Sequence, residues 1–150
     1  MAARLSHVEG SIFLVEECGG TLLWEIEDKS QFVNDLPAAL DSSVDSLSRL
    51  KLVHGDIRPW NIFYDREHKI FRIIDWGFSF FLDEDLCASP FWHLREHLKA
   101  RGHKLSDAWQ IDEVDARKTK QVVAGEWSYE KAWGHQADEM KWRPPWAKRE

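Results

Sequence analysis

Two short β-prone runs in the middle of the chain, separated by four polar residues, constrain the fold most. Residues 61–64 read NIFY and residues 69–75 read KIFRIID, while the intervening DREH has the length of a hairpin turn. An upstream run at 11–15, SIFLV, is closed by two glutamates and then a Gly-Gly pair, as is typical of a strand that leads into a turn. The sequence therefore predicts a β-hairpin and one further strand near the N-terminus.

A helix is predicted to follow that first strand and turn. Asp35 stands where a residue caps a helix N-terminus, and Pro37 falls near the first turn. Apolar residues then recur at intervals of four, four and three, the spacing of one helix face, at Leu36, Leu40, Val44 and Leu47. The pattern indicates an amphipathic helix.

The C-terminal half of the chain is less regular. It is aromatic and irregular from Gly77 to about Trp92, and then becomes helix-like. From about Lys118 to Glu150 it is polar, contains tryptophan and shows no strong periodicity. We interpret its basic end, KWRPPWAKRE, as a solvated tail, with a docking segment as the alternative.

Composition limits the class of protein. The 150 residues carry 20 basic and 26 acidic side chains, a net charge of −6, which argues against nucleic-acid binding through a strongly basic surface. No stretch approaches the roughly 18 to 20 apolar residues of a membrane helix. Two cysteines cannot build a disulfide scaffold, and the first ten residues lack the apolar core of a signal peptide. We expect an intracellular, cytoplasmic protein of about one domain that partners neither nucleic acid nor membrane.

Three polar residues around the predicted hairpin suit phosphoryl transfer. Two oxygen ligands on separate elements can hold Mg²⁺ against the phosphates of a nucleotide, and a third carboxylate can accept the proton of an attacking hydroxyl. Asn61 and Asp75 suit the ligand pair, and Asp56 suits the base. Taken singly, however, an Asp near an Asn is more often a turn feature, because both side chains bond to local backbone.

The sequence around these residues resembles a known family. HGDIRPWN at 54–61 resembles the protein-kinase catalytic loop H-R-D-L-K-P-x-N, and DWG at 75–77 resembles the D-F-G magnesium motif. The resemblance implies that Asp56 is the catalytic aspartate and that Asn61 and Asp75 are magnesium ligands. It also implies that Arg58 replaces the lysine that steadies the transferred phosphate, and that ATP and Mg²⁺ are the cofactors.

The resemblance extends on both sides of the loop. IFLVEECGGTLL resembles the strand and hinge that hold adenine, which implies that Val15, Glu16 and Cys18 bind the nucleotide. Downstream, SPFWHLREHL resembles the end of an activation segment, with Glu96 as its glutamate. SDAW resembles the start of the central helix of the C-lobe, with Asp107 as its aspartate.

The fold implied is α+β: a protein kinase-like C-lobe, mainly helical, with a short catalytic-loop β-hairpin and a truncated N-lobe. Residues 1–112 form this partial domain, and residues 113–150 form a divergent C-terminal segment. A glycine-rich loop, the V-A-I-K lysine and its helix glutamate have no counterpart, and Gly55 replaces the arginine of H-R-D. We therefore expect the chain alone to be inactive, marginally stable and prone to self-association through the exposed edge of the SIFLV strand.

Three functions stay open. The first is an ATP- and Mg²⁺-dependent phosphotransferase, or a fragment of one, acting on Ser or Thr hydroxyls, because SPFW and SDAW would shape a platform for a protein substrate. The second is a pseudokinase-like module that docks a protein partner without turnover, as the missing lysine suggests. The third is a small-molecule kinase, since H-G-D and D-W are also seen in kinases that resemble the aminoglycoside and choline kinases.

Overall fold

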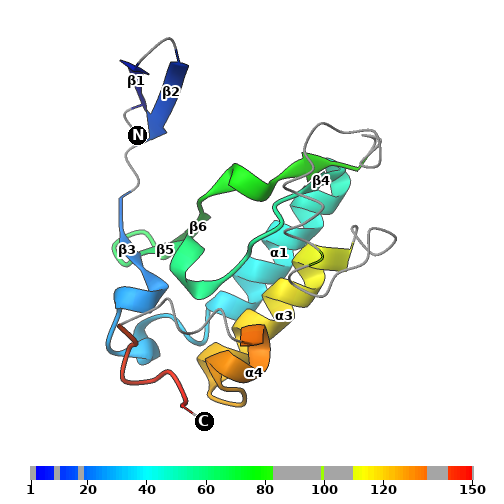
Figure 1. The fold of residues 1–150 in the computed structure, drawn as a ribbon. Coiled ribbons are helices and arrows are strands. Elements are labelled where there is room, and N and C mark those ends of the chain that lie inside the picture. The colour runs from blue at the N-terminus through cyan, green and yellow to red at the C-terminus, as the bar shows by residue number, and fades with distance from the viewer. Residues whose placement is uncertain are drawn as a thin grey trace.

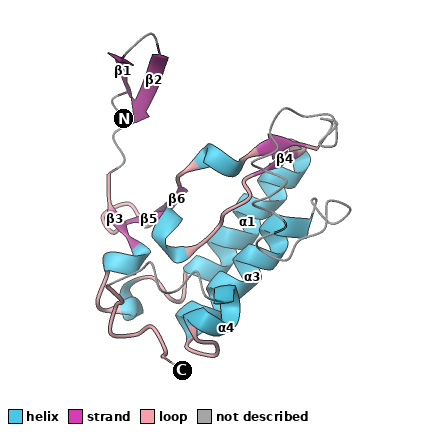
Figure 2. Cartoon of the chain, viewed as in Figure 1, coloured by secondary structure: helices cyan, strands magenta, loops and turns pink. Residues whose placement is uncertain are grey.

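The computed structural model describes residues 3–8, 11–16, 19–82, 99, 110–134 and 142–149, and for the first two of these ranges the backbone alone. Within these residues three small antiparallel sheets accompany three α-helices: α1 (Leu36–Arg49), α3 (Ile111–Ala124) and α4 (Tyr129–Trp133). Figures 1 and 2 show α1 and α3 side by side. In the same view the central hairpin lies toward the N-terminal end of α1 and the C-terminal end of α3. The predicted α+β class is confirmed. None of the described helices is long and apolar enough to cross a membrane.

The predicted N-terminal strand is present and has a partner. β2 (Ser11–Glu16) pairs antiparallel with β1 (Ala3–Val8), in a register that runs from Ala3 opposite Glu16 to Val8 opposite Ser11. Figure 1 shows this hairpin in dark blue at one end of the ribbon. The expectation of an uncovered strand was wrong for one edge of β2, because the few residues before it are enough to form a strand that satisfies its backbone groups.

The predicted central hairpin is confirmed. β5 (Ile62–Asp65) pairs antiparallel with β6 (Ile70–Ile73), with Ile62 opposite Ile73 and Asp65 opposite Ile70. A third strand, β3 (Thr21–Leu22), joins the free edge of β5. Its two residues are too short for the alternation of side chains that marks a strand in a sequence.

A second pair of short strands closes the loop region. β4 (Leu52–Val53) pairs antiparallel with β7 (Phe80–Phe81), so the stretch after Gly77 contains a strand that the sequence did not indicate. This pairing brings the segment that precedes residue 54 beside the segment that follows residue 79. The residues between these two strands therefore form one segment that the β4–β7 pair closes at both ends.

Helix α1 confirms the predicted amphipathic helix and its buried apolar face. The predicted cap is present in position only. Asp35 is the residue before the helix, but it has helical backbone angles and its side chain makes no capping hydrogen bond. The carbonyl of Phe32 accepts from the N–H groups of Asp35 and Leu36 instead, so the preceding turn satisfies the start of the helix.

Helix α3 includes the start of the stretch, from about Lys118, in which the sequence shows no strong periodicity. Its buried face includes the polar residues Asp112, Asp115 and Thr119 among apolar ones, and this mixture obscures the apolar repeat. The helix ends at Gly125, which has a positive φ of 81°. The predicted boundary between residues 112 and 113 falls inside this helix.

The basic C-terminal end is docked over residues 142–149, and its interpretation as a solvated tail was wrong there. The indole N–H of Trp24 donates to the carbonyl of Trp142 at 3.0 Å, and the indole N–H of Trp146 donates to the carbonyl of Ile26 at 2.7 Å. The Trp146 ring also packs edge-on against Trp24, with centroids 5.6 Å apart. We call residues 142–149 the C-terminal strap, because they fasten residues 24–26 to the rest of the fold.

Candidate active site

The loop of residues 54–61 is anchored to helix α3 by Asp112. One carboxylate oxygen of Asp112 accepts from the backbone N–H of His54 at 2.8 Å, and the other accepts from that of Gly55 at 2.9 Å. The Asp112 side chain is buried, so both bonds are made out of contact with water. Residue 107, the aspartate that the sequence indicated for the central helix, lies outside the described residues, and Asp112 is the aspartate that contacts the loop.

A second contact from α3 holds the other side of the loop. The hydroxyl of Thr119 donates to the carbonyl of Ile57 at 2.9 Å, and both residues are buried. Sequence analysis missed Asp112 and Thr119. Buried polar residues on a helix look like a solvated face unless their partners are known, so the sequence held no signal for their role.

The backbone of the loop requires glycine at residue 55. Its φ is +84°, and a β-carbon at this residue would lie 2.6 Å from the carbonyl oxygen of Phe78. Both the conformation and the close approach require glycine. The residue that departs from the H-R-D pattern is therefore the one that this backbone accommodates.

His54 links the loop of residues 54–61 to the end of the hairpin. Its Nδ1 accepts from the backbone N–H of Asp56 at 3.2 Å, and its Nε2 faces the carbonyl of Ile74 at 3.0 Å. This network assigns the proton to Nε2. Burial lowers the pKa of His54, although the charges of Asp112, Asp56 and Asp75 oppose that shift. The imidazole is thus a neutral structural bridge.

Asp56 is held through both of its carboxylate oxygens. Oδ1 accepts from Nε of Arg58, and Oδ2 accepts from the side-chain amide of Asn61 at 2.8 Å. The same amide nitrogen of Asn61 also donates to the backbone carbonyl of Asp56 at 3.0 Å. Asp56 is only 6% exposed. The plane of its carboxylate is therefore set by two neighbours within the loop.

Arg58 is buried beside aromatic rings. Its guanidinium carbon lies 5.0 Å from the ring centroid of Trp60, a cation–π distance. The ring of Tyr129, in α4 (Tyr129–Trp133), lies on the same Trp60 ring, with centroids 5.1 Å apart. Sequence analysis missed Tyr129, which lies in the segment without a clear pattern.

The backbone of the hairpin connects Asp75 to these residues. The backbone N–H of Ile74 donates to the carbonyl of Asn61 at 2.9 Å, so the next residue, Asp75, follows directly from a point bonded to the loop. Asp75 has left-handed backbone angles, φ 62° and ψ 73°, and its carboxylate accepts from the N–H of Gly77 at 3.3 Å. Such a conformation is costly for a residue other than glycine and is concentrated at functional sites.

The side chains of Asn61 and Asp75 carry oxygen atoms of the kind that could bind a magnesium ion. The nitrogen end of the Asn61 amide is bound to Asp56, so its oxygen end is turned away from that residue. The carboxylate of Asp75 is exposed. Amide and carboxylate oxygens are hard ligands of the kind that Mg²⁺ prefers.

The other predicted site residues are less defined. Val15 and Glu16 lie at the end of β2, opposite Arg4 and Ala3. Cys18 and Glu96 lie outside the described residues. The structure thus brings together Asp56, Arg58, Asn61 and the backbone that leads to Asp75, and it gives only backbone pairing for Val15 and Glu16.

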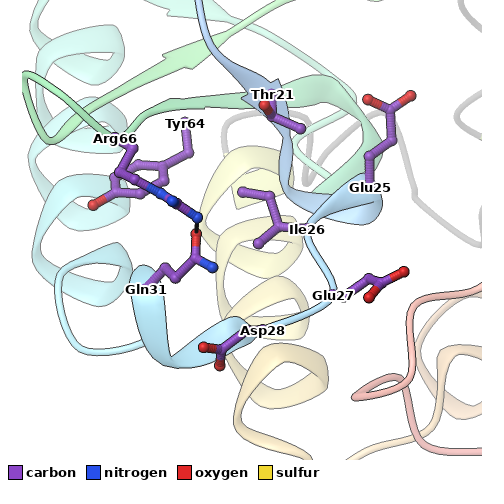
Figure 3. Close-up of a pocket in the computed structure, with 8 residues that line it drawn as sticks. All are labelled: Thr21, Glu25, Ile26, Glu27, Asp28, Gln31, Tyr64 and Arg66. Atoms are coloured by element: carbon purple, nitrogen blue, oxygen red, sulfur yellow. Dashed lines mark hydrogen bonds between the residues drawn. The ribbon is translucent and has the colours of Figure 1, made fainter.

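A separate pocket of about 390 Å³ lies between residues 21–31 and the hairpin turn. Figure 3 shows three carboxylates on one side of it and, on the other, Arg66 donating a hydrogen bond to Gln31. Its lining residues are Thr21, Glu25, Ile26, Glu27, Asp28, Gln31, Tyr64 and Arg66, none of which belongs to the loop of residues 54–61.

Comparison with known proteins connects this site to a superfamily. The family model described as the phosphotransferase enzyme family matches residues 10–83, which contain β2, the loop and Asp75. The chain is also 28% identical over 102 residues to cAMP-dependent protein kinase catalytic subunit 3 of Drosophila melanogaster, covering 63% of this chain and 17% of that protein. The chain is related to the protein kinase-like superfamily. This relationship confirms the predicted resemblance to the protein kinase-like superfamily.

Two further kinase-like relatives support the relationship. The chain is 26% identical over 114 residues to the serine/threonine-protein kinase atg1 of Dictyostelium discoideum, covering 67% of this chain and 17% of that protein. It is 29% identical over 111 residues to human cGMP-dependent protein kinase 2, covering 65% of this chain and 14% of that protein. The kinase-like chain thus spans between 14 and 17% of the length of these relatives.

Proposed function

We propose that this chain carries the catalytic loop of an ATP- and Mg²⁺-dependent phosphotransferase, with Asp56 as the base that orients the attacking hydroxyl and accepts its proton. The observation that carries the proposal is the geometry of Asp56. Its buried carboxylate is bonded on one oxygen by Arg58 and on the other by Asn61. A base held in a defined plane meets the geometric demand of proton transfer.

Asn61 and Asp75 would hold the magnesium ion in this proposal. Their oxygen atoms belong to the loop and to the end of the hairpin, two elements that are joined by the backbone bond between Ile74 and Asn61. Bound Mg²⁺ neutralises the charge of the nucleotide phosphates. Arg58 adds a positive charge beside the base, at the position that corresponds to the phosphate-steadying lysine of kinases.

Val15, Glu16 and Cys18 would contact the adenine in this proposal, as the hinge resemblance implies. Residues 1–112 would then be the C-lobe part of a kinase-like domain. The remaining covering of the nucleotide would come from a part that these residues do not include. Weak nucleotide binding is the expected consequence, because a glycine-rich loop supplies backbone donors to the phosphates in complete sites.

A protein Ser or Thr hydroxyl is the first substrate class that we propose. It is supported by the names of the three relatives, all of which are protein kinases. A small-molecule hydroxyl is the second class, and Gly55 favours it. Its φ and its contact with Phe78 exclude the arginine that protein kinases place beside the catalytic aspartate, and H-G-D is seen in small-molecule kinases.

Nucleotide titration with and without Mg²⁺ tests the metal site. We expect the unsubstituted chain to bind ATP more tightly with Mg²⁺, and Asp75→Ala to lose that gain. Asp45→Ala, an exposed carboxylate on the polar face of α1, is the matched control and should keep it. Equal binding of ATP in every arm, with or without the metal, would contradict the proposed site.

Turnover tests the base. If any phosphoryl transfer to peptide or small alcohol acceptors occurs, Asp56→Asn should lower its rate by about 10² to 10⁴-fold, the usual loss when a general base is removed, while binding MgATP as the unsubstituted chain does. Equal rates in the two proteins would show that Asp56 is not the base. Binding without any turnover in either protein would favour the pseudokinase-like alternative.

A further inference from the structure

Ser79 closes the turn that follows Asp75. This turn is a short 3₁₀-helix, Trp76–Phe78, with Asp75 at its N-terminal end and Ser79 at its C-terminal end. The backbone N–H of Ser79 donates to the carbonyl of Trp76 at 3.0 Å, and the hydroxyl of Ser79 donates to the same carbonyl at 2.6 Å. The residue directly after Asp75 is therefore bonded twice to Ser79.

We propose that Ser79 is a positioning residue for the metal site, and that its hydroxyl holds Asp75 in the orientation in which the carboxylate would bind Mg²⁺ together with Asn61. This inference rests on the proposed function, in which Asn61 and Asp75 are the ligands. Ser79 touches neither the metal nor the nucleotide in this scheme. Its effect passes through the backbone of Trp76.

The backbone of Asp75 needs such a restraint. Its angles, φ 62° and ψ 73°, are left-handed, and a residue other than glycine keeps this conformation only where its surroundings fix it. The carboxylate of Asp75 accepts from the N–H of Gly77 at 3.3 Å, which is long for a hydrogen bond of this kind. The conformation of Asp75 therefore depends on the backbone groups on either side of it.

Hydrogen bonds hold the backbone on both sides of Asp75. On the N-terminal side, the N–H of Ile74 donates to the carbonyl of Asn61 at 2.9 Å, which ties the chain to the residue that carries the other proposed ligand. On the C-terminal side, the carbonyl of Trp76 accepts both bonds from Ser79, which set the direction in which the chain leaves Asp75. Of these three bonds, the one from the Ser79 hydroxyl is made by a side chain, so a substitution can remove it and leave the other two donors in place.

Ser79 is itself held in place by the strand that follows it. Its backbone is extended, with φ −76° and ψ 149°, and the next residue, Phe80, begins β7. Phe80 is buried and pairs with Val53 of β4, directly before the loop of residues 54–61. The hydroxyl therefore reaches Trp76 from a residue whose position the β4–β7 pair sets relative to that loop.

Removal of the hydroxyl should weaken the metal site without abolishing it. The Trp76 ring would still contact His54, with centroids 4.6 Å apart, and the N–H of Ser79 would still donate to the Trp76 carbonyl. Loss of one hydrogen bond changes an equilibrium by about 2- to 10-fold. We therefore expect Asp75 to adopt other orientations for part of the time. More Mg²⁺ is then needed for the same occupancy, while the affinity for ATP without metal stays the same.

The first test measures the turn directly and needs neither nucleotide nor metal. In the full chain labelled with ¹⁵N-glycine, the amide signal of Gly77 is assigned by its loss in Gly77→Ala. We expect Ser79→Ala to raise the solvent-exchange rate of this amide by about 2- to 10-fold, because its acceptor is the carboxylate of Asp75. Ser79→Thr keeps a hydroxyl and should retain the original rate. An unchanged exchange rate in Ser79→Ala would overturn the proposal.

The second test is the Mg²⁺ dependence of ATP binding. In Ser79→Ala we expect the Mg²⁺ concentration that gives half of the gain in ATP affinity to rise about 2- to 10-fold, and the full gain to return at saturating Mg²⁺. Ser79→Thr should restore the original midpoint, and Ser48→Ala, which removes an exposed hydroxyl from α1, should keep it. An equal rise in Ser79→Thr would overturn the proposal, because the effect would then not depend on the hydroxyl.

The two tests together separate this inference from the proposed function. If the unsubstituted chain gains no affinity for ATP with Mg²⁺, the proposed metal site fails, and the Gly77 amide by itself then decides whether the Ser79 hydroxyl restrains Asp75. If the unsubstituted chain shows the gain and the Mg²⁺ midpoint does not move in Ser79→Ala, the metal site stands and the positioning role of Ser79 is overturned.

Discussion

The backbone of Gly55 passes so close to Phe78 that a β-carbon at residue 55 would stand 2.6 Å from the Phe78 carbonyl oxygen. The obstacle is backbone, which cannot swing aside as a side chain can. The loop that carries Asp56 and the segment that follows Asp75 are therefore fitted to each other at a residue without a side chain. This contact determines which residue can precede Asp56 in this fold.

Gly55→Ala should lower the free energy of unfolding by about 2 to 4 kcal/mol, because alanine is strained at this φ and also collides with the carbonyl oxygen. Denaturant titration measures the loss. Gly19→Ala is the control, since a β-carbon at Gly19 would meet no atom within 4 Å, and it should change the stability by less than about 0.5 kcal/mol. Equal stability of the two variants would mean that the loop can move away from Phe78.

Asp112→Asn should destabilise the chain by about 2 to 4 kcal/mol, because an amide can accept from only one of the two N–H groups of His54 and Gly55 and presents a donor to the other. Glu113→Gln, the next residue of α3 and an exposed one, is the control and should be nearly neutral. Hydrogen exchange at the amides of residues 54 and 55 should increase in the first variant. Amides that stay protected would show that another group anchors the loop.

Stability should fall as the solution is acidified below about pH 6.5, in part through His54. Burial lowers the pKa of His54 in the folded state below its usual 6.5, so the unfolded chain takes up the proton first. The free energy of unfolding is therefore full above pH 6.5 and declines as the pH falls toward the lower, folded pKa, by at most about 1.4 kcal/mol per pH unit. Denaturant titrations from pH 5 to 8 measure this slope.

One histidine variant isolates that contribution. His54→Gln should show a shallower slope than the unsubstituted chain, whatever its stability at pH 8. If the slope is the same in both proteins, His54 takes up no proton on unfolding in this range.

Trp146→Ala should destabilise the chain by about 2 to 3 kcal/mol, because it removes a half-buried indole and its hydrogen bond to Ile26. Trp142→Ala is the control within the same C-terminal strap. The Trp142 side chain is 47% exposed, and the bond to Trp24 uses its backbone carbonyl, so the substitution should cost about 1 kcal/mol or less. If the two variants lose similar amounts of stability, the packing and hydrogen bond of the Trp146 indole do not contribute specifically.

The parts of the fold that the sequence predicted are those whose pattern is local. The central hairpin and α1 are marked by repeats of their own, and Asp56 and Asn61 lie within one short loop. The two-residue strands β3, β4 and β7 carry no such pattern, since their positions depend on the partner strand. The cap at Asp35 was mistaken because the turn at Phe32 already supplies the acceptors.

The site residues that the sequence did not reveal lie far along the chain from the loop that they support. Asp112, Thr119 and Tyr129 support the loop from helices that follow it, and each is a polar side chain on an otherwise ordinary helix. Their type alone suggests a surface residue, and only the packing of α3 and α4 shows them to be buried. The motifs around Asp56 thus predict the chemistry of the loop, while residues without a motif hold the loop in place.

The position of the C-terminal strap at the end of the sequence also determines when its contacts can form during synthesis. A chain leaves the ribosome N-terminus first, yet the carbonyl of Ile26 receives its indole donor only after residue 146 has been added, and the amides of His54 and Gly55 wait for Asp112. The segment with the kinase-like motif is therefore translated long before the residues that hold it in place. A nascent chain stopped before α3 would expose this loop without its anchor, and chaperones would meet that unfinished surface.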